Sequence, residues 1–193
     1  MKKIVLSPVF IFISFFAFAQ TTIEVNTDAS NVKLKGSKIY KSHEGTIDIQ
    51  SGHLIVDGSR LQGGEFVIDM RTIVNTDIES ERGRSNLEAH LANEDFFDVD
   101  NHATSHLIIK KVDWIEETAY KLVGELIIKG ISNQITFNAD VKIKKSAFLA
   151  MANIKIDRTR WDIKYKSNSV FSELGEKAIL DEIEFDVFLL SVK

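Results

Sequence analysis

Apolar and polar side chains alternate with a period of two along much of this chain, and this pattern constrains the fold most. The clearest example is the segment 134–144, in which every second side chain is apolar and the intervening ones are polar or charged. Such alternation is typical of an antiparallel strand with one face buried and the other in water. The apolar face of this segment carries Ile135, Phe137, Ala139, Val141 and Ile143.

Strands of this kind are expected to recur from residue 20 to the C-terminus, separated by short turns. Ser51-Gly52 and Gly63-Gly64 are among the predicted turns. The only proline, Pro8, precedes this region, so proline removes no hydrogen bond from the predicted sheet. About eight antiparallel strands result, and their spacing is typical of an all-β barrel or sandwich. The predicted strands cover residues 23–34, 46–50, 53–57, 65–70, 120–128, 134–144, 148–156 and 182–192.

Two segments depart from the alternation. Residues 75–91 place a few apolar side chains among charged ones, which predicts one short helix with Thr76 or Asp77 as its N-cap. Residues 167–181 are expected to form a loop. Because no repeat or linker interrupts residues 20–193, we predict that they form a single domain.

The first 19 residues have the three parts of a secretory signal peptide. Two lysines supply a positive start, residues 4–16 are almost wholly apolar, and Ala17-Phe18-Ala19 places small residues where a signal peptidase requires them. The apolar run is shorter than the roughly 20 residues that a membrane-spanning helix needs. We therefore expect residues 1–19 to be removed, which leaves a periplasmic or secreted chain without an integral membrane segment.

Charge and cysteine content argue against several classes of function. Without residues 1–19 the chain keeps 22 of its 24 basic residues and all 28 acidic ones, a formal charge of −6. A modestly acidic chain without runs of lysine or arginine is poorly suited to bind nucleic acid or an anionic membrane surface. The absence of cysteine excludes disulfides and a lipid anchor on cysteine, so stability must come from burial and backbone pairing.

Several short motifs occur in a definite order along the chain. The segment 64–73 (GEFVIDMRTI) is followed by His90-Leu91, by 95–99 (DFFDV), and then by the hairpin sequence 124–131 (GELIIKGI). Their order and spacing resemble the YceI-like family over nearly the whole chain, and 158–165 (RTRWDIKY) resembles the family's closing motif. The resemblance implies an extended, lipocalin-like antiparallel barrel. It also implies an apolar tunnel that holds a polyisoprenoid or another long-chain amphiphile.

The chain departs from the commoner family pattern at two places. Leu87 and Glu88 stand where the commoner form has an Arg-Asp pair, and the proline usual after the DFFDV motif is replaced, with Asn101-His102-Ala103 in this chain. Arg82 and Arg84, about one helical turn away, are the candidates to replace the family's arginine at a ligand headgroup.

The resemblance implies ligand contacts along the apolar face of the barrel and around the end of the helix. Phenylalanines serve a packed core or a cavity equally well, since the two look alike in sequence. His90 likewise has two interpretations: it bonds locally at the helix end, or it contacts the ligand's headgroup. The predicted ligand-binding residues are His90, Phe96, Phe97, Phe66, Ile68, Leu126, Ile135, Phe137, Ala139, Val141, Trp161 and Tyr165.

No catalytic, metal or cofactor site is expected. His102 and His106 lie where a loop enters a strand, so they need not share a face. His43 and His53 lack clustered carboxylates at ligand-like spacing. The sequence contains no nucleophile-elbow, zinc-protease or phosphate-binding motif.

The expected function is therefore non-catalytic binding, transport or sequestration of a long-chain apolar amphiphile. Two alternatives remain open: a hydrolase or isomerase that acts on such a lipid through His90 with Glu88 or Asp95, and a packed scaffold that binds a protein partner. An enzyme needs a positioned acid or base with a third group that orients it, and the sequence shows no such set. Homodimer formation also remains open.

The signal-peptide hypothesis predicts that the exported protein begins at Gln20, with this residue either free or cyclised to pyroglutamate. The intact mass of the exported protein tests the prediction directly. A mass that still includes residues 1–19 would contradict the expected location.

Overall fold

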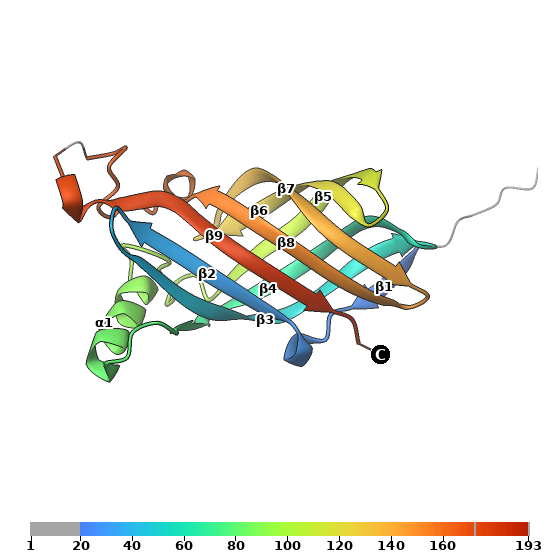
Figure 1. Ribbon diagram of the computed structural model, residues 1–193, viewed down its shortest axis with the longest axis horizontal. Helices are drawn as coiled ribbons and strands as arrows, with labels where there is room; N and C mark the ends of the chain where they lie inside the picture. Colours follow the sequence, from blue (N-terminus) through green and yellow to red (C-terminus); the bar gives the residue numbers. More distant parts are fainter. Residues whose placement is uncertain (1–19, 172, 193) are drawn as a thin grey trace, which may run out of the picture.

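The structure, a computed structural model, describes residues 20–171 and 173–192 and shows an antiparallel β-barrel (Figure 1). The strands lie in the order β1-β3-β2-β9-β8-β7-β6-β5-β4, and the pairing of β3 with β4 closes β2 to β9 into a ring. The predicted all-β barrel is thereby confirmed, whereas the predicted signal peptide lies outside the described residues. The strands are β1 (Thr21–Glu24), β2 (Asn31–Lys38), β3 (Ser42–Asp57), β4 (Arg60–Asn75), β5 (Thr104–Glu116), β6 (Ala119–Ile128), β7 (Ile131–Lys144), β8 (Ala147–Asp157) and β9 (Ile179–Leu190).

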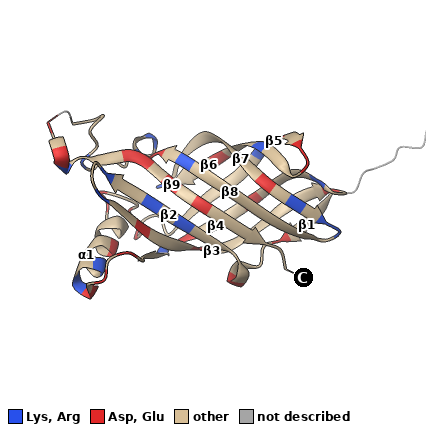
Figure 2. Ribbon diagram, in the orientation of Figure 1, with Lys and Arg blue, Asp and Glu red and all other residues tan. Residues whose placement is uncertain are grey.

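Alternation along each strand separates an apolar interior from a polar exterior. In β7, Ile135, Phe137, Ala139 and Val141 are buried, and the side chains between them are exposed, as the sequence predicts. Figure 2 shows acidic and basic segments distributed along the barrel without a large region of one sign. No helix within the described residues is long and apolar enough to cross a membrane.

β3 and β4 are longer than the sequence pattern predicts. The predicted turns at Ser51-Gly52 and Gly63-Gly64 are wrong, because each strand continues through them. Register shifts in the β3–β4 pairing lie beside both places, between Ile49 and Ser51 and opposite Leu61 and Gly63. A Cβ atom on Gly52 would lie 2.6 Å from Cδ1 of Phe66, and one on Gly64 would lie 2.7 Å from the backbone oxygen of His53. These glycines therefore allow close approach between neighbouring strands, which only a residue without Cβ permits.

The predicted first strand at 23–34 is in fact two strands. The 3₁₀ turn η1 (Thr27–Ala29) separates β1 from β2, and the side chain of Asn26 caps this turn by accepting a hydrogen bond from the Ala29 N–H at 3.2 Å. β1 pairs with the second half of β3 and β2 with the first half. The two short strands together thus cover one side of the 16-residue β3.

The helix α1 (Glu81–Ala92) lies at one end of the barrel (Figure 1). Its N-cap is Ser80, whose hydroxyl accepts a hydrogen bond from the Gly83 N–H at 3.2 Å. The predicted caps, Thr76 and Asp77, are therefore wrong, and the helix begins later than predicted. Serine satisfies one of the free N–H groups of the first turn, as N-caps generally do.

Asn75, the last residue of β4, joins the barrel to the helix. Its backbone N–H donates to Oε1 of Glu88 at 2.8 Å, and its side-chain amide donates to the carbonyl of Glu44 at 2.9 Å and to the carboxylate of Asp77. Its Oδ1 accepts from the Ile78 N–H at 3.0 Å. Burial opposes ionisation of Asp77, but hydrogen bonds, led by the one from Asn75, keep its pKa below the usual value.

The two ends of the barrel differ. The connections β2–β3, β4–β5, β6–β7 and β8–β9 lie with α1 at what we call the helix end (Figure 1). At the opposite, closed end, Val56, Tyr120 and Phe148 fill the interior and are almost completely buried. The loop predicted between β8 and β9 is confirmed, except that β9 starts earlier than predicted. The whole β8–β9 connection, residues 158–178, begins earlier than the predicted loop and contains the 3₁₀ turns η2 (Arg158–Trp161) and η3 (Gly175–Lys177).

Arg158 holds this connection against the barrel. Its side chain is 0% exposed and donates from Nε to the Leu180 carbonyl at 3.1 Å, from Nη1 to the Ile163 carbonyl at 2.7 Å and from Nη2 to the Ile179 carbonyl at 3.0 Å. Asp181 lies 3.3 Å from Nη2. Burial lowers the pKa of Arg158 and Asp181 acts in the opposite direction, but an arginine keeps its charge at ordinary pH.

Replacing Arg158 with methionine should lower the free energy of unfolding by about 2–4 kcal/mol, because three carbonyls lose their donor in a buried place. Arg160→Met is the matched control on the same turn, since Arg160 is exposed, and we expect it to cost below about 1 kcal/mol. Urea unfolding followed by circular dichroism measures both. An equal decrease of the free energy of unfolding in the two variants would contradict the role assigned to Arg158.

Candidate functional site

A cavity lies inside the barrel, and we call it the barrel cavity. It contains about 1160 Å³ of space free of protein atoms, including its opening to solvent. Among the described residues that line it, Ser105 alone has a polar side chain, and its hydroxyl donates to Sδ of Met70 at 3.0 Å. The barrel cavity therefore presents an almost wholly apolar surface.

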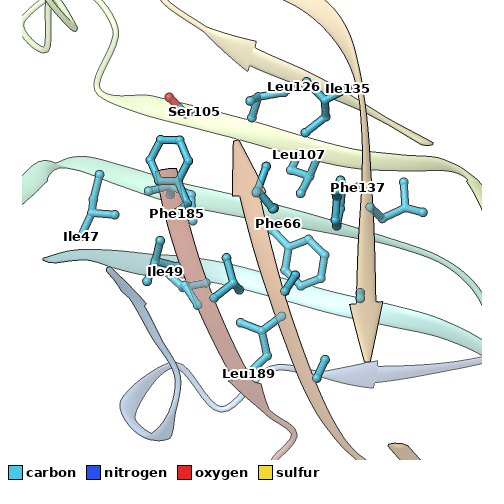
Figure 3. A pocket seen from close by; sticks show the side chains of 18 of the residues that line it. Ile47, Ile49, Phe66, Ser105, Leu107, Leu126, Ile135, Phe137, Phe185 and Leu189 are labelled. Carbon is cyan, nitrogen blue, oxygen red and sulfur yellow. The ribbon is translucent and has the colours of Figure 1, made fainter. Parts of the chain in front are cut away.

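Most of the residues predicted from the sequence line this cavity. Phe66, Leu126, Ile135 and Phe137 lie around the same space and come from β4, β6 and β7 (Figure 3). Alternation predicted this wall correctly, because β6 and β7 form a hairpin whose apolar faces coincide. The predicted residues that line the barrel cavity are Phe66, Ile68, Phe97, Leu126, Ile135, Phe137, Ala139 and Val141.

Sequence analysis missed the wall supplied by β2, β3, β5 and β9. Ile47 and Ile49 of β3, Leu107 of β5, and Phe185 and Leu189 of β9 also line the cavity (Figure 3). Leu107 lies between the predicted residues Phe66 and Leu126 on neighbouring strands. The predicted strands omit β5, because its apolar residues Leu107, Ile108 and Ile109 are consecutive, whereas alternation marks the side chains named on β3 and β9 as inward-facing. The sequence did not show that the sheet closes into a ring. Only this closure brings β3 and β9 across the cavity from β6 and β7.

Small side chains leave space along the wall formed by β7 and β8. Ala139 lies directly opposite Ala152 in this strand pair, and Val141 lies opposite Ala150. All four residues line the barrel cavity. Because a methyl group reaches less far inward than the phenylalanines of the other strands, this wall contributes directly to the hollow.

A second cavity, the mouth cavity, lies at the helix end and contains about 1060 Å³ of space, again including open solvent. Polar and charged side chains, among them His90 and Lys166, form part of its lining. Leu34, Ile73 and Phe97 line both cavities, so the two spaces meet at these residues. An apolar chamber thus adjoins a more polar one.

The positions at which the chain departs from the family pattern also lie here. Leu87 lines the mouth cavity, whereas Arg82 and Arg84 are not among the described residues that line it. Glu88 is bound to the backbone of Asn75. The predicted replacement of the family's arginine by Arg82 or Arg84 therefore finds no support in the cavity lining.

His90 carries an unused hydrogen-bond donor at the mouth cavity. Its ring lies edge-on to Phe96 at 5.0 Å and to Tyr165 at 4.5 Å between centroids. Nδ2 of Asn93 lies 3.2 Å from Nδ1 of His90, and an amide nitrogen only donates, so Nδ1 accepts this bond. The neutral ring then carries its proton on Nε2, a buried atom without a hydrogen-bond partner among the described residues.

Trp161 differs from the other predicted ligand-binding residues, because it lines neither cavity. Its side chain is 0% exposed, and its indole N–H donates to the Leu126 carbonyl at 3.0 Å. This bond ties η2 to β6. The placement of Trp161 assigns it a structural role.

No acid–base pair is assembled around His90. Glu88 accepts the hydrogen bond from the backbone of Asn75, and the Asp95 residue is exposed. The hydrogen-bond partner of His90 is Asn93, an amide that neither takes up nor releases a proton at ordinary pH.

His102 and His106 have different polar neighbours. Nε2 of His102 lies 3.8 Å from the carboxylate of Asp98, whereas Nε2 of His106 lies 3.2 Å from the Thr104 hydroxyl. Over the part of the chain that the structure describes, no group of three or more His, Cys, Asp or Glu side chains could hold a metal ion.

The family model described as YceI-like domain matches residues 23–189 of this chain. The match covers all strands of the closed barrel and both cavities, apart from the last residues of β9. No curated protein sequence matches the chain.

Solved structures with the same fold cover most or all of the chain. BcnA of Burkholderia cenocepacia is 14% identical with a TM-score of 0.64, over 87% of this chain and 99% of that one. A polyisoprenoid binding domain from Saccharophagus degradans, implicated in plant cell wall breakdown, is 13% identical with a TM-score of 0.66. The match covers 90% of this chain and 98% of that one. The YCEI protein of Campylobacter jejuni is 20% identical with a TM-score of 0.55, over 100% and 99%. At these identities the likeness shows the fold alone.

The hollow barrel predicts the effect of filling it. Ala139→Phe should leave the ligand-free protein at least as stable as the wild type, because the added ring enters open space. Ala178→Phe is the matched control: Ala178 is 1% exposed and lines neither cavity. A ring forced into that packed place should cost about 1–3 kcal/mol.

Urea unfolding of lipid-extracted, refolded protein compares the two variants. If the free energy of unfolding falls as much in Ala139→Phe as in Ala178→Phe, the interior around Ala139 is packed rather than hollow.

Proposed function

This chain belongs to the family of YceI-like domains, and from that premise we propose that it binds a long-chain apolar amphiphile in the barrel cavity without catalysing its conversion. The ligand is of the polyisoprenoid or fatty-acid-like class. The protein transports or sequesters it in the periplasm or outside the cell.

The apolar lining of the barrel cavity carries this proposal. A lipid chain needs no polar partner, and burying ten methylene groups contributes roughly 8 kcal/mol at ~0.8 kcal/mol each, before the costs of association. Ser105, the polar side chain in the lining, already uses its hydroxyl within the wall. A chain can therefore slide along the wall without meeting an unpaired polar group. The polyisoprenoid binding domain among the similar structures supports the same class of ligand.

The mouth cavity supports an amphiphile over a simple hydrocarbon. A tail in the barrel cavity would pass Phe97 and place its polar group beside His90 and Tyr165. The unused N–H of His90 Nε2 would donate to an oxygen of that group, which satisfies a buried donor that otherwise costs free energy. The preferred headgroup therefore carries a hydrogen-bond acceptor, such as a carbonyl, hydroxyl or phosphate oxygen.

Mass spectrometry of organic extracts tests the proposal. Extracts of the purified wild-type protein should contain a long-chain amphiphile in near-stoichiometric amount, and extracts of Ala139→Phe should contain far less, because the ring occupies the space of the chain. A wild-type protein that carries no such molecule and takes up none from a mixed lipid extract would contradict the proposed function.

His90→Ala in the same experiment tests the headgroup contact. Ligand retention should fall, and the melting temperature of the ligand-free protein should stay nearly unchanged. His102→Ala is the matched control, since His102 lies at the same end and is not among the residues lining either cavity. If the His90 ring only braces the helix, retention stays normal and stability falls by about 1–3 kcal/mol, which would end the headgroup assignment.

A further inference from the structure

Apolar side chains project into solvent from two neighbouring loops at the helix end. The tip of the β2–β3 hairpin carries Ile39, which is 50% exposed, and Tyr40, which is 82% exposed. The β8–β9 connection carries Val170 and Phe171, which are 43% and 51% exposed. Because β2 pairs with β9, the two loops lie next to each other (Figure 1).

Lysines accompany these apolar tips. Lys38 and Lys41 flank the Ile39-Tyr40 pair directly. Lys166 lies within the β8–β9 connection, with its ammonium group 5.1 Å from the ring centroid of Tyr165. Among the ion pairs of the described residues, none includes Lys38, Lys41 or Lys166. All three lysines line the mouth cavity, so apolar tips and cations surround one opening.

We propose that the helix end docks through these two loops on the surface of a lipid bilayer that contains anionic lipids. Tyrosine is enriched at the boundary between headgroups and water, and aliphatic and phenylalanine side chains enter the adjacent acyl region. Lysines there are attracted to anionic headgroups, and their long side chains let the charge stay at the interface. The bilayer would then face the opening of the mouth cavity.

The distribution of charge determines which side of the helix end approaches the bilayer. Whole-chain charge argues against an anionic surface, but that value averages over the entire molecule. Acidic residues at this end gather in the β4–β5 connection, residues 76–103, which carries eight acidic and two basic residues. The charged residues of the β2–β3 tip, residues 38–41, are both lysines. The β8–β9 connection, residues 158–178, carries five basic and three acidic residues. The side formed by β2 and β9 is therefore the one that approaches an anionic bilayer.

A bilayer fits this surface better than a folded protein partner does. The exposed side chains stand on separate loop tips around an opening and do not form one flat face, whereas a protein interface needs a contiguous, complementary patch. This inference does not depend on which ligand the barrel binds, because it concerns loops outside the barrel cavity.

Vesicle flotation with ligand-free protein tests the docking. The wild type should bind vesicles of phosphatidylcholine with about a third phosphatidylglycerol roughly tenfold more tightly than vesicles of phosphatidylcholine alone, and raised salt should remove this difference. Ile39→Ser/Tyr40→Ser and Lys38→Gln/Lys41→Gln should each reduce binding to the mixed vesicles by about tenfold.

Matched controls come from the closed end. Ile115 and Val192 are 50% and 51% exposed there, and Lys144 and Lys145 flank the β7–β8 turn. Ile115→Ser/Val192→Ser and Lys144→Gln/Lys145→Gln should leave vesicle binding unchanged. Loss of binding in these controls as large as in the helix-end variants, or a wild type that binds no vesicle, would overturn the proposal.

A polarity-sensitive fluorophore locates the contact independently of affinity. The sequence contains no cysteine, so Tyr40→Cys and Ile115→Cys each provide a single labelling site. Emission from position 40 should rise and shift to shorter wavelength with mixed vesicles, and emission from position 115 should not change. The reverse pattern would place the docking surface at the closed end and refute the proposal.

Discussion

Closure of the sheet by the pairing of β3 with β4 is the constraint on which the rest of the structure depends. The register of this pair runs from Gly45 opposite Asn75 to Asp57 opposite Arg60, so the hairpin extends along nearly the full length of both strands. A closed sheet satisfies backbone groups between strands, and its interior needs no polar side chain for that purpose. The interior can therefore be apolar throughout, and its side chains are free to pack or to leave space.

The interior is packed at one end of the barrel and hollow toward the other end. β1 pairs with the second half of β3 and adds Ile23 and Val25 to the interior at the closed end, where both are about as buried as any core residue. Beside Val56 and Tyr120 they fill that end. The small side chains of Ala139, Ala150 and Ala152 line the barrel cavity, and Ala139 lies directly opposite Tyr120 in the β6–β7 pair. The hollow therefore begins beside the packed end and continues to the mouth cavity at the helix end. β1 and β2 thus divide β3 between them: β1 pairs with it at the packed, closed end, and β2 pairs with it at the open helix end.

The sequence predicted the parts of this arrangement that depend on one strand and its two faces. Alternation identified β7 and most of β6, because a period of two needs only one buried side. It failed at Gly52 and Gly64, since the reason for a glycine there is a remote contact with a neighbouring strand. Alternation also could not distinguish residues that line a cavity from residues of a packed core. Phe66 lies beside the cavity and Phe148 lies in the packed end, yet both follow the same pattern. The exclusion of Trp161 from both cavities depends on its bond to Leu126, which no local pattern contains.

The positively charged side chains at the mouth cavity come from the connections between strands and not from the helix α1. Leu87 lines it where the commoner family pattern has an arginine, and Glu88 is occupied by the hydrogen bond that holds β4 to α1. The helix therefore supplies no cation to this space. The cations come instead from Lys38 and Lys41 on the β2–β3 hairpin and from Arg158 and Lys166 after β8. The guanidinium of Arg158 is bound to three backbone carbonyls, so the three lysines supply the positive charge that no carbonyl holds. Lys38 and Lys41 are exposed and Lys166 is half-buried, so solvent screens the first two in particular. Such charges attract anions that approach the opening more than they fix one headgroup in place. In the proposed function, His90 provides a buried, directional N–H at the mouth, and the lysines provide long-range attraction.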